Sequence, residues 1–138
     1  MVVLGIDPGT ALTGYGFIDA AANGTLKLIE YGVISTASDM KMEARLLQLY
    51  HEMNQKILLH RPEKAAVEKL FFHRNVTTAI AVGQARGVIM LSLAQVGMDI
   101  LEFTPMEVKQ AVVGYGGADK RQVQLMVKAI LNLNDIPR

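Results

Sequence analysis

The stretch VVLGIDPGT (residues 2–10) decides the fold, because it reads as a buried strand that ends in a carboxylate and then turns sharply. A second strand follows at once in TGYGFI (residues 13–18), where alternate positions are glycine and share one face. Open α/β sheets bind their ligands beyond the carboxyl ends of the strands. Asp7 therefore stands where a functional group is expected, although a single acid there could also be a turn residue.

The rest of the chain adds further strands and then helices. Asn23-Gly24 is typical of a hairpin turn, and Thr104, Pro105 and Glu107 form the start of a capped helix. The expected strands are 2–7, 13–18, 25–35, 64–68 and 99–103; the expected helices are 38 or 39 to 61, 75–95, 104–113 and about 119–131. This order predicts an α/β fold: a mixed sheet, with a three-stranded antiparallel meander and parallel strands, flanked by helices.

Two of the expected helices carry packing patterns. Gly83 and Gly87 share a face of the helix 75–95, which would let its backbone lie close to the sheet or to a partner. The last helix is expected to turn its apolar side chains inward; these are Val123, Met126, Val127, Ile130 and Leu131.

Length and composition favour one cytoplasmic domain. The chain has 138 residues, so we expect a single domain over residues 1–138. It has no cysteine, which excludes disulfides and thiolate metal sites and fits a cytoplasmic location. We expect no membrane span, because the longest apolar candidate, residues 88–98, is interrupted by Ser92 and Gln95. No basic stretch precedes the first apolar run, so we expect no signal peptide.

The net charge of +1 does not by itself indicate a nucleic-acid ligand. Residues 1–55 carry three basic and six acidic side chains, whereas residues 56–138 carry eleven basic and seven acidic ones. This uneven distribution permits a phosphate-rich ligand, and ordinary solvated surface charge explains it equally well.

A second acid, Glu68, ends the apolar strand 64–68 and forms a candidate metal site with Asp7. If the two strands are neighbours, the carboxylates converge, and a cation between them would relieve their repulsion. Oxygen ligands select Mg²⁺ or Mn²⁺, and two such ions about 3.5–4 Å apart can drive phosphodiester hydrolysis. An ion pair of Glu68 with Lys64 or Lys69 on the surface is an equally good interpretation of the spacing.

The loop KLFFHRN (residues 69–75) places two aromatics and basic residues next to this site. Phe71 could stack on unpaired bases, since each such contact is worth about 1–3 kcal/mol, and Arg74 adds to the basic character of the loop. Lys109 and Lys120 lie near helix starts and could grip phosphates. Alternatively, a phenylalanine fills the core and each lysine is only solvated.

Several blocks together resemble the RuvC-type Holliday-junction resolvases. They span nearly all 138 residues in order and consist of GIDPGT (5–10), TGYG (13–16), VE (67–68), GQARG (83–87), VKQAVVG (108–114), Lys120 and QVQ (122–124). The resemblance implies a ribonuclease-H-like nuclease that binds four-way DNA junctions as a homodimer, nicks them with Mg²⁺ during recombination and repair, and works beside a branch-migration helicase.

The resemblance also implies roles for individual residues. Asp7 and Glu68 would be the catalytic, metal-binding carboxylates of a site that holds two Mg²⁺ ions, with Mn²⁺ able to substitute. Phe71 would press on bases at the junction centre, and Lys109 and Lys120 would contact DNA, with Arg74 a further DNA-binding candidate. Thr10 occupies the place of a small hydroxyl residue near the metals. The helix with Gly83 and Gly87 falls in the region used for dimer contacts.

One departure concerns the last residues. The family places two more carboxylates on a C-terminal helix, whereas this chain stops at residues 134–138, and Asp135 in a connecting segment is not expected to replace them. We therefore expect this polypeptide, as a nuclease domain lacking its C-terminal helix, to bind metal weakly and cleave poorly. We also expect apolar surface to remain exposed on the sheet.

Other function classes remain open from the residues. Asp7, Gly9 and Gly14 loosely match the phosphate-binding hairpin of actin-like proteins and sugar kinases, which need a second domain to close on the nucleotide; ATP binding would favour that class. A non-catalytic junction-binding module would bind four-way junctions tightly without cleavage. Within the same fold, a nuclease for RNA or for another branched structure is also compatible.

Overall fold

The computed structural model describes residues 1–69, 76–114 and 116–137. Five strands and four helices follow one another as β1 (Val2–Asp7), β2 (Leu12–Ala20), β3 (Leu26–Ser35), α1 (Met42–His60), β4 (Lys64–Glu68), α2 (Val76–Gln95), β5 (Asp99–Phe103), α3 (Pro105–Val113) and α4 (Lys120–Leu131). The predicted element order is confirmed. The expected single domain over 1–138 stays a prediction, and Asn75, a plausible cap of α2, lies outside the described residues.

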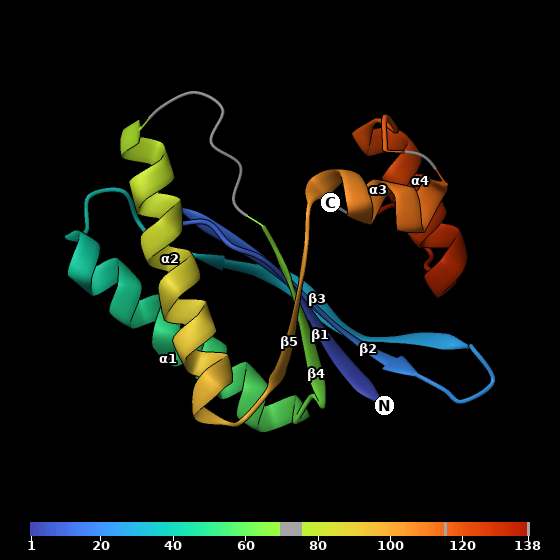
Figure 1. Cartoon of the computed structure of the whole chain (residues 1–138), viewed down its shortest axis with the longest axis horizontal. Helices are drawn as coiled ribbons and strands as arrows, with labels where there is room; N and C mark the ends of the chain where they lie inside the picture. Colours follow the sequence, from blue (N-terminus) through green and yellow to red (C-terminus); the bar gives the residue numbers. More distant parts are fainter. Residues whose placement is uncertain (70–75, 115, 138) are drawn as a thin grey trace.

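The strands form one mixed sheet in the order β3-β2-β1-β4-β5. β1 pairs antiparallel with β2 and parallel with β4, β2 pairs antiparallel with β3, and β4 pairs parallel with β5. The predicted meander joined to parallel strands is therefore confirmed. In Figure 1 the helices fall into two pairs, α1 with α2 on one side and α3 with α4 on the other.

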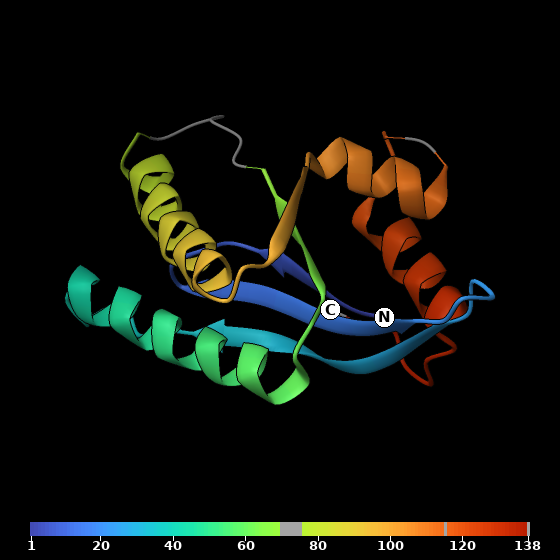
Figure 2. The same ribbon diagram turned by 60° about the horizontal axis from the view of Figure 1, so that its bottom comes forward.

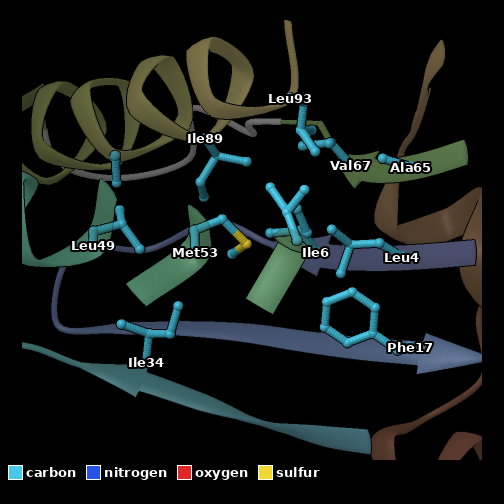
Figure 3. Close-up of a cluster of buried hydrophobic side chains, with 12 residues drawn as sticks. Leu4, Ile6, Phe17, Ile34, Leu49, Met53, Ala65, Val67, Ile89 and Leu93 are labelled. Atoms are coloured by element: carbon cyan, nitrogen blue, oxygen red, sulfur yellow. The ribbon is translucent and has the colours of Figure 1, made fainter. Parts of the chain in front are cut away.

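The core lies between the sheet and the pair α1–α2 (Figure 3). Alternate residues of the strands point into it, because successive side chains of a strand face opposite sides. From the central strands come Leu4, Phe17 and Val67, all without solvent exposure, and from the helices Met53 and Ile89. This layer fixes β1 and β4 side by side, which is what positions the site described below.

α2 is long and apolar enough to cross a membrane by length and composition, contrary to the expectation that no segment is. It packs against α1 and places Ala85, Ile89 and Leu93 in the core without solvent exposure. A helix that supplies the core of a domain passes the same test as a membrane span. Burial in the core explains the apolar residues on one face of α2, whereas Val76, Ile80 and Leu91 are exposed on the other.

Two boundary and packing expectations are wrong. α1 begins at Met42 with Lys41 as its N-cap, because Ser38 and Asp39 belong to a turn in which the N–H of Met40 donates to the carbonyl of Ala37. The apolar residues of α4 are not buried as expected; Met126 and Ile130 are about two fifths exposed. α4 packs with α3 and touches β3 rather than the core of the sheet, so its apolar stripe stays in contact with solvent.

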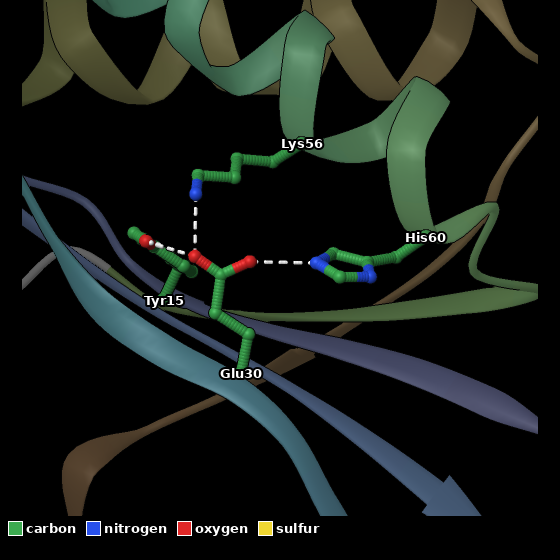
Figure 4. A network of polar contacts seen from close by, with 4 residues as sticks. All are labelled: Tyr15, Glu30, Lys56 and His60. Carbon is green, nitrogen blue, oxygen red and sulfur yellow. Dashed lines mark hydrogen bonds and ion pairs between the residues drawn. The ribbon is translucent and has the colours of Figure 1, made fainter.

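α1 is tied to the sheet by a polar network centred on Glu30 of β3 (Figure 4). Tyr15 of β2 donates a 2.9 Å hydrogen bond to Glu30, and Lys56 and His60 of α1 contact its two carboxylate oxygens, His60 at 2.6 Å. Gly32 leaves the room this requires, since a Cβ there would stand 2.7 Å from the Tyr15 hydroxyl oxygen. The network fixes β2 and β3 against α1.

Candidate active site

Asp7 and Glu68 end two adjacent parallel strands. Ile6 of β1 lies opposite Val67 of β4, so the next residue of each strand reaches the same edge of the sheet. Asp7 is exposed and Glu68 is partly buried. The expectation that the two strands are neighbours is confirmed, and the convergence of the carboxylates follows from this register.

The carboxyl group of Glu68 is strongly influenced by its surroundings. The pKa of Glu68 is raised to about 7, first by burial, then by the negative charge of Asp7 and by a hydrogen bond between the two side chains. The positive charge of Lys109 on α3 acts in the opposite direction. Among the described ion pairs, none joins Glu68 to Lys64 or Lys69, so the surface-pair interpretation of Glu68 is wrong.

The turn after Asp7 is held rigidly. A Cβ at Gly9 would lie 2.2 Å from the carbonyl oxygen of Leu12, so only glycine fits this position without moving the chain. The buried hydroxyl of Thr13 donates to the carbonyl of Gly9 at 2.5 Å and accepts from its N–H at 3.2 Å. Gly14 lies opposite Asp7 across β1 and β2, and a Cβ there would meet the Asp7 Cβ at 3.7 Å. Small residues therefore surround Asp7 and keep its carboxylate accessible.

Two cavities meet at the carboxylates. The first, of about 220 Å³, is lined by both acids together with Lys69, Val82 and Arg86. The second, of about 340 Å³, also includes both acids and extends towards Phe103 and Val108. A ligand can therefore approach the acids from α2 or from β5 and α3.

The residues present fit a hard divalent cation. Two carboxylates supply oxygen ligands only, and the pKa of Glu68 is raised first by burial and then by the charge of Asp7, both of which a bound cation would oppose. The Thr10 hydroxyl, three residues after Asp7, is shielded from solvent without a hydrogen-bond partner in the described chain, while its carbonyl accepts from Thr36 at 2.6 Å. No group of three or more His, Cys, Asp and Glu residues that could hold a metal occurs among residues 1–69, 76–114 and 116–137.

The predicted DNA-binding residues are placed unequally. Lys109 acts on Glu68 and so belongs to the site. Lys120 is exposed at the start of α4, where Asp119 and Gln122 form a capping box. Among the residues that the structure describes, no ion pair joins Lys120 to Asp7 or Glu68. Phe71 and Arg74 lie outside the described residues.

Sequence reasoning missed one feature of the first cavity. Arg86 of α2 forms an ion pair with Glu102 of β5, with 2.6 Å between Nη2 and Oε1. The available signal was the block GQARG (83–87), which the resemblance included without a role for its arginine. This ion pair depends on how α2 packs against the sheet, which local patterns do not reveal.

Comparison with known proteins adds independent information. The family model described as "Crossover junction endodeoxyribonuclease RuvC" matches residues 3–138. Proteins of that name from Desulfitobacterium hafniense (strain DSM 10664 / DCB-2) and Chloroflexus aurantiacus are 53% and 54% identical over 138 residues, which are 100% of this chain and 83% and 84% of theirs.

Solved structures agree with this match. The structure of Thermus thermophilus RuvC in complex with a Holliday junction substrate superimposes with a TM-score of 0.94 at 35% identity, covering 100% of this chain and 84% of that one. The yeast mitochondrial Holliday junction resolvase Ydc2 has a TM-score of 0.67 at 16% identity, over 94% of this chain and 60% of that one, and so shares the fold.

Proposed function

The chain belongs to the RuvC family of crossover junction endodeoxyribonucleases, and from this premise we propose that it hydrolyses phosphodiester bonds of four-way DNA junctions at the Asp7–Glu68 site. The observation that carries the proposal is the pair of carboxylates at the ends of adjacent parallel strands, beside two cavities, where burial and the charge of Asp7 raise the pKa of Glu68. Family membership decides against the actin-like and sugar-kinase alternative.

Asp7 and Glu68 are the proposed ligands of Mg²⁺, two ions per site, with Mn²⁺ able to substitute. When bound, such ions polarise an attacking water and stabilise the leaving oxygen. Positive charge close by favours the ionised form of Glu68 at neutral pH, because burial and Asp7 both favour its protonated form. Lys109 supplies part of that charge, and Thr10 offers a hydroxyl in the adjoining turn.

The remaining contacts are proposed from the family. Lys109 and Lys120 would bind DNA phosphates, Arg74 would add a third cation, and Phe71 would press on bases at the junction centre. The branch-migration helicase and a cytoplasmic location are proposed on the same ground.

A homodimer through α2 has support from the surface of that helix. Val76, Ile80 and Leu91 are each more than half exposed, and Gly83 and Gly87 share their face, with no atom within 4 Å of a Cβ built on either glycine. These five residues are called the α2 outer stripe below. Exposed apolar side chains beside small residues suit close packing of a second α2.

The second candidate function is junction binding without cleavage. It is favoured by the donor set, since the described residues bring together two carboxylates and no third acid or histidine. The two candidates differ in one observable, the appearance of nicked strands on a bound junction.

The test compares labelled four-way junctions with linear duplexes of the same sequence, in Mg²⁺, Mn²⁺ and EDTA. Asp7→Asn and Glu68→Gln should each lower nicking by at least about 100-fold and weaken Mn²⁺ binding measured by EPR, since even residues that support metal ligands are worth about 10- to 100-fold. Asp99→Asn, an exposed carboxylate at the opposite end of β5, is the matched control and should change neither.

Junction affinity separates the outcomes. The proposal expects both variants to bind junctions at least as well as the parent chain, because a negative charge near the phosphates has been removed. Tight, metal-independent binding with no nicking by the parent chain would favour the non-catalytic module. Loss of junction binding in Asp7→Asn would instead assign Asp7 a structural role.

A further inference from the structure

Arg86 brings a cation to the cavity that contains the two candidate metal ligands. It lies one helical turn after Val82 on α2, and both line the cavity of about 220 Å³ together with Asp7 and Glu68. Its partner Glu102 lies opposite Val67 in the pairing of β4 with β5, which is one residue before Glu68. The guanidinium is therefore anchored by the neighbouring strand next to the carboxylates.

The ion pair with Glu102 engages only one of the two terminal nitrogens of the guanidinium. Nη2 contacts Glu102 at 2.6 Å, whereas Nη1 is shielded from solvent and has no hydrogen-bond partner in the described part of the chain. The side chain is only 18% exposed. Buried polar atoms without a partner are rare in native proteins and indicate a missing ligand or water. The planar guanidinium fork matches the oxygens of a phosphate.

We propose that Arg86 binds a phosphate oxygen of the DNA strand that the Asp7–Glu68 site cleaves. This inference rests on the proposed function and names a substrate contact within it. Two carboxylates in one cavity repel a phosphodiester, and a cation in the same cavity offsets that repulsion. Lys69 also lines the cavity, but its side chain is exposed and its charge acts on Glu107 of α3. Arg86 is therefore the cation whose position beside the acids is better fixed.

The experiment measures junction affinity against salt concentration in EDTA, so that its result does not depend on metal or cleavage. Each phosphate contact contributes about 0.9 to the slope of log K against log salt on duplex DNA. Arg86→Gln should reduce that slope by about 0.9. In Mg²⁺ it should also slow nicking by about 10- to 100-fold, the effect of losing hydrogen bonds to a charged group.

Two variants distinguish binding from structure. Glu102→Gln breaks the same ion pair but keeps the cation, so it should lower the melting temperature about as much as Arg86→Gln and leave the salt slope unchanged. Lys27→Gln removes an exposed cation at the far end of the meander and should alter neither quantity. Arg86→Lys keeps the charge without the fork, and should keep the slope while nicking more slowly.

The results distinguish failure of the proposed Arg86–phosphate contact from failure of the proposed junction-cleaving function. If the unchanged chain binds junctions and Arg86→Gln keeps its full salt slope, Arg86 is only a structural link between α2 and β5, and the inference is overturned. If Glu102→Gln loses the same slope as Arg86→Gln, the effect is structural and the inference is again overturned. Failure of the unchanged chain to bind junctions would overturn the proposed function and this contact with it.

Discussion

Glu30 and Glu68 are the same side chain in surroundings that shift its pKa in opposite directions. Hydrogen bonds from Lys56, then from His60, lower the pKa of Glu30 to about 2, because they favour its ionised form. Burial and the neighbouring carboxylate of Asp7 raise the pKa of Glu68 to about 7. The ionised form of Glu30 is stabilised by Lys56 and His60, whereas burial and Asp7 disfavour the ionised form of Glu68. This contrast assigns Glu30 to stability and Glu68 to the site.

We expect Glu30 to make stability fall in acid. A carboxyl whose pKa is lower when folded stabilises the protein above its unfolded pKa of about 4.5, and this contribution is lost as the pH falls from about 4.5 to about 2. The shift corresponds to about 3 kcal/mol at most, and we expect about 1–2 kcal/mol, since Glu30 is 27% exposed and solvent screens the contacts.

Urea unfolding at pH 7 and pH 3 tests this expectation. Glu30→Gln should lower the free energy of unfolding at pH 7 by about 1–2 kcal/mol and show a smaller loss of stability between the two pH values than the parent chain. Glu43→Gln, at an exposed position in the first turn of α1, is the control. An equal acid dependence in Glu30→Gln and the parent would contradict the assignment.

α3 brings Lys109 to the carboxylates, and its position depends on how the helix begins. Thr104 and Glu107 form the predicted capping box: the N–H of Glu107 donates to the Thr104 hydroxyl, and the N–H of Thr104 donates to the Glu107 carboxylate, both at 3.1 Å. That bond from the Thr104 backbone lowers the pKa of Glu107. The box fixes the first turn, and Lys109 follows one turn later.

Thr104→Ala should therefore affect both stability and the site. Loss of the cap is worth about 0.5–2 kcal/mol in the free energy of unfolding, measured by urea denaturation. Junction affinity should fall as well, because α3 carries Lys109. Thr25→Ala in the turn between β2 and β3 is the matched control and should leave affinity unchanged. If Thr104→Ala is destabilised but binds junctions as tightly as the parent chain, α3 does not contribute to DNA binding.

The two helix pairs give the molecule different unburied surfaces. α2 is buried on one side by the core and carries the α2 outer stripe on the other, while α4 leaves Met126 and Ile130 about two fifths exposed. In Figure 2 the ribbon of α2 lies apart from that of α4. A symmetric dimer uses the same patch twice, and the outer stripe meets this requirement in the proposed assembly.

Charge placed in the α2 outer stripe should dissociate the proposed dimer. Ile80→Glu buries a charge if two α2 helices pack together, which is strongly unfavourable. Sedimentation velocity of the parent chain should give a dimer, and Ile80→Glu should give a monomer with the same circular dichroism. Leu59→Glu, at a 69% exposed leucine of α1, is the control and should remain dimeric. Dissociation by Leu59→Glu alone would move the interface to α1.

Local patterns sufficed for the element order, the capping box of α3 and the candidate acids, because each depends on residues near in sequence. Asp7 and Glu68 were identifiable since each ends an apolar strand before a turn. The start of α1 was missed because Ser38 and Asp39, good caps by type, are used in a turn. The inward packing of α4 was expected from the spacing of its apolar residues. That spacing shows that one face of the helix is apolar, but it does not show which other element covers that face.

The contacts between residues that are far apart in the sequence are set by the tertiary structure and not by local sequence patterns. The pairing of β1 with β4 sets two acids 61 positions apart side by side and raises the pKa of Glu68. The packing of α2 against the sheet joins Arg86, which lines the same cavity as the two acids, to Glu102 of β5. The energy of a charge interaction falls with the distance between the charges in space and does not depend on their separation along the chain. Side-chain type and spacing could therefore nominate the acids, while their coupling and their cationic neighbour arose from strand order and helix packing.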